Sequence, residues 1–370
     1  MVKPVQLIIA FTCLCAGGVL TVAQGAPSPV WSFAVSGDSR NCGDVVMPAI
    51  AAGVLKTQAR FYWHLGDYRA IYDFDEDMVA PAALHLDQPH MTISSYLAGA
   101  WPDFIEHQLL PFGDRQVFLG IGNHETIPPK THDGYLIQFG SYLNNESVEK
   151  QRRADHDISD GIRSYYHWTM DAVDFITLDN ATDSSFDPQQ MQWIRARIAA
   201  DRDSNAIKAV VVGMHEALPG SVGLSHSMCD SSDGVATGRE VYQLLLGLQS
   251  AGKHVYVLAS HSHFVVEDVY DTPYWKGQVL PGWIVGTAGA VRYRLPDGVA
   301  AGKLAKTDVY GYLMGTVMSD GSVQFEFKEL SVDDLSKANA GRLPDAVVTW
   351  CYAENKDARI PKPVACGAGN

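Results

Sequence analysis

The chain has 370 residues, of which 46% are hydrophobic and 19% charged, values that suit a globular protein of one large domain or two smaller ones. This composition excludes a largely disordered chain and a membrane protein with many spans. The formal net charge of −14 argues against duplex nucleic acid as a partner, because phosphate backbones are bound through clustered Lys and Arg.

Residues 1–25 are typical of a secretory signal peptide. Lys3 supplies the positive start, residues 5–22 are uncharged and apolar, and Ala23-Gln24-Gly25 offers small residues for cleavage. A retained membrane anchor is the alternative. With the signal peptide removed, we expect a secreted or periplasmic protein without a stable membrane span. We expect its domain to cover residues 26–330 and a C-terminal tail to cover residues 331–370.

Four cysteines follow the predicted signal peptide: Cys42, Cys229, Cys351 and Cys366. An even number in an exported chain permits two disulfides, in three possible connectivities. Cys351 with Cys366 is the local choice and would tie down the tail. Cys42 would then pair with Cys229.

The first predicted elements form a βαβ unit. Residues 31–36 and 60–65 are expected to be strands, and residues 45–57, with Pro48 near the start, a helix. Asp38 and Asp67 each follow one of these strands. Because the strands of a βαβ unit are parallel, both aspartates are expected at the same sheet edge.

A long connection over residues 73–115, predicted to be helical over 91–110 and partly a flap, precedes the most informative stretch. The apolar run 117–121 ends in Asn123, His124 and Glu125. We therefore expect a buried strand that delivers an amide, an imidazole and a carboxylate to its carboxyl end. Residues 126–160 are polar and predicted to be irregular.

The second half repeats the pattern of a strand followed by histidine. A strand over residues 209–212 is predicted to end before His215, and a strand over 254–259 before His261 and His263. The other predicted elements are a hairpin over 165–178, an amphipathic helix over 188–200, a helix over 239–249, and strands at 283–285, 310–317 and 322–330.

Six polar residues thus follow five predicted strands: Asp38, Asp67, Asn123, His215, His261 and His263. In α/β sheets, ligands collect beyond the carboxyl ends of the strands. Carboxylate and amide oxygens together with imidazole nitrogens are donors that metal cations take, and burying them without a neutralising partner is costly. The pattern predicts a metal site. The alternative is that these residues are caps and turns, in which case Asp67→Ala would be tolerated.

The series of motifs resembles that of the calcineurin-like metallophosphoesterases, which runs Asp-x-His, Gly-Asp, Gly-Asn-His-Glu/Asp, His and Gly-His-x-His. Tyr165-Tyr166, the segment 189–193 and Tyr310-Gly311-Tyr312 are similar to the purple-acid-phosphatase-like branch. The resemblance covers residues 31–330. It implies an α/β fold, a four-layer αββα sandwich of two mixed β-sheets, with the metal site at the carboxyl ends of the strands.

The resemblance also implies roles for the residues at the strand ends. Asp67 would bridge two metal ions. The second metal would be completed by Asn123, His215 and His261, and the first would be bound by Asp38 and His263.

Two neighbouring residues would act beside the metals. His124 would stand next to the phosphate as a general acid or electrostatic partner. Glu125 would orient His124 or line the site, or else order its loop through hydrogen bonds.

Arg40 departs from the family pattern, which has histidine at that position. Arginine stays protonated and offers only donors, so it cannot be a metal ligand. The branch also has a tyrosine three residues after the bridging aspartate, where this chain has Ala70, and Ser260 replaces the usual glycine before His261. Three roles stay open for Arg40: it clamps a substrate phosphate, it replaces one metal's charge, or it points away into an ordinary salt bridge.

The predicted function is metal-dependent hydrolysis of a small-molecule phosphate ester, with phosphomonoesters favoured. One or two divalent or trivalent ions, Fe, Zn or Mn, would present a metal-bound hydroxide for attack on phosphorus. His124 and Arg40 are the expected catalytic residues.

Other functions remain as alternatives. A phosphodiesterase would differ only in its pocket walls, which Trp101, Tyr135 and the loop 220–238 are expected to supply. A catalytically degenerate phosphate- or nucleotide-binding protein is the second alternative. A metal-dependent amidohydrolase on a barrel is disfavoured, because that class has an early His-x-His motif and here the motif comes last.

Overall fold

The computed structural model describes Met1 and residues 26–78, 91–157, 161–223, 226–296, 299, 304–359 and 366. Residues 2–25, on which the predicted signal peptide falls, lie outside the described residues. Within the described ranges, no helix has both the length and the apolar character that crossing a bilayer requires.

Two mixed β-sheets form the centre of the molecule. The first sheet has the strand order β12-β11-β1-β2-β3, and the second β10-β8-β9-β7-β6-β5-β4. The strands of the first sheet are β1 (Pro29–Ser36), β2 (Ala59–His64), β3 (Gln116–Leu119), β11 (Tyr310–Met318) and β12 (Val323–Leu330). Those of the second are β4 (Tyr166–Met170), β5 (Val173–Thr177), β6 (Ala209–Gly213), β7 (His254–Ala259), β8 (Val265–Glu267), β9 (Gly282–Val285) and β10 (Ala305–Lys306).

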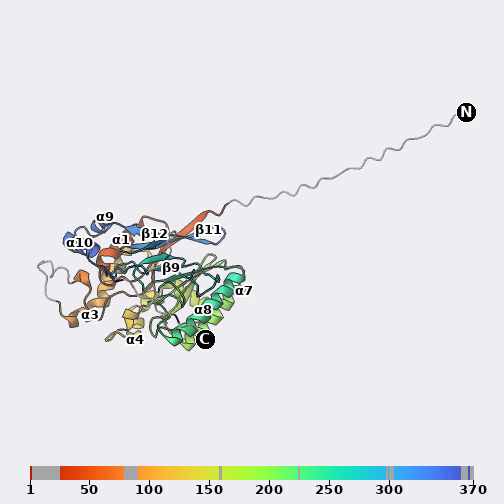
Figure 1. Cartoon of the computed structure of the whole chain (residues 1–370), viewed down its shortest axis with the longest axis horizontal. Helices are drawn as coiled ribbons and strands as arrows, with labels where there is room; N and C mark the ends of the chain where they lie inside the picture. Colours follow the sequence, from red (N-terminus) through yellow and green to blue (C-terminus); the bar gives the residue numbers. More distant parts are fainter. Residues whose placement is uncertain are drawn as a thin grey trace.

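Helices cover the outer faces of both sheets. The α-helices are α1 (Gly43–Leu55), α3 (Ile93–Phe104), α4 (His132–Gln138), α5 (Gly140–Leu143), α6 (Glu146–Ala154), α7 (Pro188–Asp203), α8 (Ser232–Ser250), α9 (Val332–Asn339) and α10 (Asp345–Ala353). Figure 1 shows α1, α9 and α10 on the side of the first sheet, and α7 and α8 on the side of the second. The predicted four-layer αββα sandwich of two mixed sheets is confirmed.

Aromatic side chains fill the space between the two sheets. Phe118 of β3 stacks on Trp168 of β4 with ring centroids 3.7 Å apart, and Phe33 of β1 meets Phe175 of β5 edge to face at 5.0 Å. A Cβ atom at Gly213 would lie 2.3 Å from the Trp63 ring, so glycine is needed where β6 approaches β2. Aromatic pairs of this kind bury large apolar areas and fix the spacing of the sheets.

The parallel strands lie where the motifs predict them. β1 pairs in parallel with β2 and β2 with β3, while β6 pairs in parallel with β7. Their carboxyl ends therefore all deliver loops to one edge of the sandwich. The predicted hairpins β4–β5 and β11–β12 are also present.

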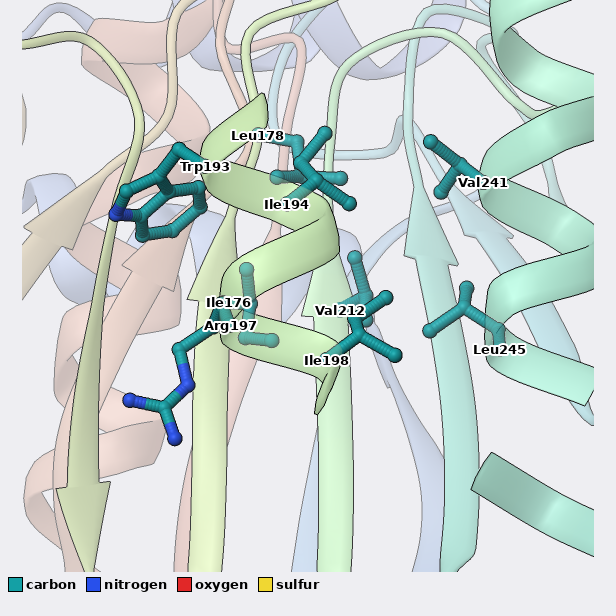
Figure 2. Close-up of a pocket in the computed structure, with 9 residues that line it drawn as sticks. All are labelled: Ile176, Leu178, Trp193, Ile194, Arg197, Ile198, Val212, Val241 and Leu245. Atoms are coloured by element: carbon teal, nitrogen blue, oxygen red, sulfur yellow. The ribbon is translucent and has the colours of Figure 1, made fainter. Parts of the chain in front are cut away.

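The amphipathic stripe of α7 is part of the core, as expected. Ile194 and Ile198 are buried between β6 and α8, whereas Arg197 points the other way (Figure 2). The helix begins at its N-cap Asp187, whose side chain accepts hydrogen bonds from the backbone N–H groups of Gln189 and Gln190.

Three expectations are corrected by the structure. The segment 126–160 was expected to be irregular, but α4, α5 and α6 form within its described residues, 126–157. Pro48 lies within α1, which begins at Gly43, earlier than predicted. The polar C-terminal segment folds into α9 and α10, and Leu335, Val347 and Val348 join the main hydrophobic core.

The expected disulfide pairing is wrong. The bonds join Cys42 with Cys351 and Cys229 with Cys366. Cys351 lies on the buried face of α10, and packing brings it to the start of α1, where Cys42 is located. Nearness in the sequence therefore did not decide the pairing.

Candidate metal centre

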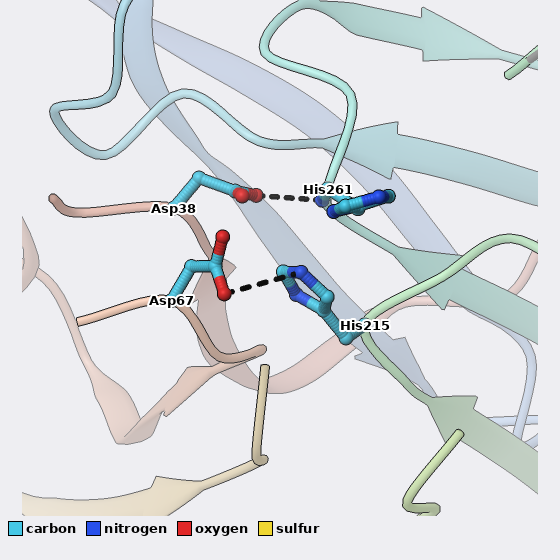
Figure 3. Close-up of side chains that lie close together, drawn as sticks. All are labelled: Asp38, Asp67, His215 and His261. Atoms are coloured by element: carbon cyan, nitrogen blue, oxygen red, sulfur yellow. Dashed lines mark hydrogen bonds and ion pairs between the residues drawn. The ribbon is translucent and has the colours of Figure 1, made fainter. Parts of the chain in front are cut away.

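Loops after five strands bring six polar side chains to one place. Asp38 follows β1, Asp67 follows β2, Asn123 follows β3, His215 follows β6, and His261 and His263 follow β7. Figure 3 shows four of them, Asp38, Asp67, His215 and His261, facing one another at the edge of the sandwich.

Short contacts join these side chains across the two sheets. The backbone N–H of His261 donates to Asp38 Oδ2 at 2.7 Å, and His263 Nε2 lies 3.4 Å from Asp38 Oδ1. His215 Nε2 lies 3.3 Å from Asp67 Oδ1 and 3.1 Å from Asn123 Oδ1. All six residues predicted to bind metal are therefore within one cluster.

The backbone at the strand ends adopts an uncommon conformation. Asp38, Asp67 and His261 have φ values of 60°, 62° and 63°, in the left-handed region. Non-glycine residues rarely occupy this region, and holding one there costs about 1–3 kcal/mol. The strain falls on three of the residues that converge, which fits a site maintained for function.

The residues of the cluster suit a metal cation. One donor atom from each of Asp38, Asp67, His215 and His261 lies within 4.8 Å of the others. Asp38 Oδ1, Asp67 Oδ2 and His261 Nδ1 are buried, and none of them makes a hydrogen bond within the described part of the chain. Leaving buried polar atoms without a hydrogen bond is costly, and a carboxylate–imidazole set is one that divalent metals take.

The charges of the cluster agree with that interpretation. Burial alone would raise the pKa of Asp67, but the neighbouring imidazoles of His124 and His215 hold it well below its usual value. Burial opposes protonation of His215, yet the charge of Asp67 raises the pKa of His215 to about 10. Burial lowers the pKa of His261 well below its usual value. The carboxylate is thus ionised, and cation binding at His215 Nε2 would release the proton that His215 holds.

His124 is oriented by the loop after β2. Its Nδ1 lies 2.6 Å from the carbonyl oxygen of Ala70, which can only accept, so Nδ1 carries the proton. Nε2 is then directed toward Asp67 Oδ2, 3.6 Å away. Burial lowers the pKa of His124 to about 4.

Glu125 orders the loops around the cluster instead of lining it. The side chain is fully buried, and its carboxylate accepts hydrogen bonds from the backbone N–H groups of Asp67, Tyr68 and Gly122 at 2.8–3.0 Å. Of the roles left open from the sequence, this is the loop-ordering one.

Arg40 points into the cluster, which rules out the salt bridge directed away from it. Its side chain is only 6% exposed, Nε lies 3.5 Å from Asp67 Oδ2, and Nη2 lies 3.3 Å from His263 Nε2. Nη1 donates to Asn41 Oδ1 at 3.1 Å and to the hydroxyl of Tyr72 at 3.2 Å.

Three aromatic residues at the cluster were not singled out from the sequence as functional. Tyr293 stacks on the His263 ring at 4.1 Å, His226 lies 5.0 Å from the His261 ring, and Tyr72 lies 5.2 Å from the His124 ring. His226 belongs to the loop 220–238 that was expected to form a wall, so its position there was a usable signal. Tyr293 belongs to no recognisable sequence motif, so the sequence carried no signal for its position.

Trp101 and Tyr135 are not pocket walls. Both side chains are buried in the main core, and the hydroxyl of Tyr135 lies 3.3 Å from that of Tyr68. The expectation that they line a substrate pocket is therefore wrong: Trp101 lies on α3 and Tyr135 on α4, and both join the core.

Comparison of the whole chain with solved structures identifies a similar architecture. Purple acid phosphatase PPD1 from yellow lupin (Lupinus luteus) seeds matches with a TM-score of 0.54 and 14% identity, over 85% of this chain and 52% of that one. Over the matched part, the chain has the same fold as the lupin purple acid phosphatase. It spans about half the length of the lupin protein.

Two further matches have lower scores. A structure of PhoD matches with a TM-score of 0.48 and 15% identity, over 84% of this chain and 73% of that one. GAP50, the anchor in the inner membrane complex of Plasmodium, matches with a TM-score of 0.45 and 11% identity, over 93% of this chain and 100% of that one. No protein-family model and no curated protein sequence matches the chain. The purple acid phosphatase fold agrees with the resemblance found in the motifs.

Proposed function

We propose that this chain is a metal-dependent phosphoester hydrolase with a preference for phosphomonoesters. The observation that carries the proposal is the convergence of donor atoms from Asp38, Asp67, His215 and His261. Asn123 lies beside His215, and Arg40 lies beside Asp67. Zn, Mn or Fe bound there would polarise a phosphoryl oxygen and lower the pKa of a bound water to about 7.

The chain's own residues would perform the remaining tasks. Asp67, Asn123, His215 and His261 would hold the cation. His124 presents Nε2 on the Asp67 side of the centre as a neutral imidazole, so it would accept the proton that the attacking water loses and give it to the leaving oxygen. The buried guanidinium of Arg40 adds a fixed positive charge beside the phosphate.

The charge balance supports a monoester over a diester. Asp38 and Asp67 contribute two negative charges, which one divalent cation neutralises, and Arg40 adds one positive charge. A phosphomonoester dianion gains more from this excess than a diester monoanion does. A phosphodiesterase is therefore the alternative, and it would require the walls near Tyr72, His226 and Tyr293 to admit a second ester group.

A non-catalytic phosphate-binding protein is a second candidate, because Arg40 stands where the family pattern has a metal-binding histidine. Such a protein would bind phosphate or a nucleotide and release no product.

Parallel assays test the proposal. Purified protein is given p-nitrophenyl phosphate and bis-(p-nitrophenyl) phosphate before chelation, after EDTA treatment, and after Zn²⁺, Mn²⁺ or Fe²⁺ is returned. We expect faster hydrolysis of the monoester, loss with EDTA and recovery with metal. Asp67→Asn should abolish activity, whereas Asp73→Asn, at an exposed position of the same connection, should not.

Hydrolysis that persists after complete removal of metal would contradict the proposal. Faster hydrolysis of the diester would favour the phosphodiesterase. Phosphate binding by calorimetry without any turnover would favour the binding protein.

The two disulfides fit an oxidising compartment, so we also propose that the protein is secreted or periplasmic after loss of residues 1–25.

A further inference from the structure

Asp67 directs its two carboxylate oxygens toward different positive groups. Oδ1 faces His215 Nε2 at 3.3 Å, on the side where Asn123 also lies. Oδ2 faces the guanidinium of Arg40, 3.5 Å from its Nε. A bridging carboxylate would use one oxygen for each of two cations, and here one of the two cationic positions is already filled by a side chain.

A metal ion would not fit in the position that Arg40 occupies. An ion there would need Asp67 Oδ2, Asp38 Oδ1 and His263 Nε2 at about 2.0–2.2 Å from its centre. The guanidinium nitrogens already lie 3.5 Å from Asp67 Oδ2 and 3.3 Å from His263 Nε2. Arginine does not give up its proton, so it cannot become a ligand, and its charge would repel a second cation at this distance.

Arg40 is held in place from several directions. Its Nη1 is bonded to Asn41 Oδ1 and to the Tyr72 hydroxyl, and its backbone N–H donates to the carbonyl oxygen of Asp67 at 3.2 Å. Two residues later, Cys42 is linked to Cys351. Leaving the cluster would cost Arg40 these bonds and would leave Asp67 Oδ2 buried with only His124 nearby.

We propose that Arg40 replaces one of the two metal ions, so that the centre binds a single divalent cation, held by Asp67, Asn123, His215 and His261. This inference deepens the proposed function and rests on its metal centre. His263 then holds the guanidinium side of the site. Asp38, whose carboxylate lies within 4.8 Å of the donor atoms of Asp67, His215 and His261, borders the single metal position and does not complete a second one.

Counting metal ions tests this inference without an activity assay. Protein loaded with excess Mn²⁺ and then desalted is analysed by inductively coupled plasma mass spectrometry and by electron paramagnetic resonance. We expect one equivalent per chain in the wild type, with the spectrum of an isolated Mn²⁺. Arg40→His, which exchanges the cation for a ligand, should bind two equivalents and give the spectrum of a coupled pair. Arg60→His, at an exposed ion pair with Asp171, is the matched control and should bind one.

The outcomes separate the two proposals. Two equivalents in the wild type would overturn the replacement by Arg40 and leave the hydrolase intact. One equivalent in both the wild type and Arg40→His would also overturn it, since Arg40 would not be what limits the count. A wild type that binds no metal would overturn the proposed function as well.

A crystal of the Mn²⁺-loaded wild type decides the question even if Arg40→His does not fold. A single anomalous peak beside Asn123 and His215 supports the inference, and a peak beside His263 overturns it.

Discussion

The carboxylate of Glu125 accepts a hydrogen bond of 2.9 Å from the backbone N–H of Asp67, a residue whose φ of 62° lies in the left-handed region. A second oxygen of the same carboxylate accepts from Tyr68 at 3.0 Å. Glu125→Gln replaces one acceptor by a donor, so Asp67 should lose its fixed position. We expect cation affinity to fall by about 10- to 100-fold, measured by competition with a chelating dye.

Glu149→Gln on α6 is the matched control, since Glu149 makes its ion pair with Arg153 at an exposed surface. Unchanged affinity in Glu125→Gln would show that Asp67 does not depend on this contact.

His124→Gln should separate turnover from metal binding. His124 presents Nε2 beside Asp67 without belonging to the donor set of the proposed cation. Removing a general acid lowers turnover by about 10²- to 10⁴-fold, and we expect kcat to fall within that range while metal content stays the same. His254→Gln, an exposed histidine at the start of β7, serves as the control. Normal turnover in His124→Gln would remove His124 from the mechanism.

Arg69 is a buried cation in an acidic cluster next to the metal centre. Its fully buried guanidinium contacts Asp44 at 2.6 Å and Asp75 at 3.6 Å, and also pairs with Asp103. Arg69→Met would leave these carboxylates without their counter-charge. Breaking a buried ion pair on one side costs about 3–5 kcal/mol, so urea denaturation should show a loss of stability of that order.

Arg195→Met is the comparison for Arg69, because Arg195 pairs with Glu240 at the surface, where such pairs contribute little. If Arg69→Met and Arg195→Met unfolded at the same urea concentration, the carboxylates around Arg69 would not depend on its charge.

His167 should make the stability depend on pH. Burial opposes its protonation, but ion pairs with Asp155 and Asp174 raise the pKa of His167 to about 9, with Arg197 packed beside them. The unfolded chain has a histidine pKa of about 6.5. The charged form therefore stabilises the fold fully below about pH 6.5, and this contribution, about 3 kcal/mol, is lost as the pH rises through about 9.

Urea denaturation at pH 6 and pH 9.5 checks this prediction. His167→Gln should reduce the difference between the free energies of unfolding at these two pH values, and His254→Gln should leave that difference unchanged. A wild type with the same free energy of unfolding at both values would contradict it.

Much of the fold could be predicted from the positions at which apolar runs end in the sequence. Each predicted parallel strand is present. A short apolar run that ends in glycine and then Asp, Asn or His is compatible with few structures other than a buried strand. The proximity of Asp38 and Asp67 also followed, since β1 and β2 are parallel neighbours. The approach of His215 depends on how the second sheet packs against the first.

Other features depend on packing that a single sequence does not display. α6 carries only one buried residue, Val148, so it has no hydrophobic stripe to detect. A local signal was nevertheless present, because Asn145 caps the helix by accepting from the N–H groups of Ser147 and Val148. The direction of Arg40 could not be predicted, since its contacts with Asp67 and His263 join segments far apart in the chain.

The bond between Cys42 and Cys351 has a practical consequence for how the protein is prepared. It fastens the turn that carries Arg40 to a helix more than three hundred positions later. In a host whose cytosol keeps thiols reduced, this bond would not form, and the turn that carries Arg40 would be held by its hydrogen bonds and ion pair alone. Metal counts made on such material would describe a different molecule, so expression should be directed to an oxidising compartment, with free thiols titrated before any ion is counted.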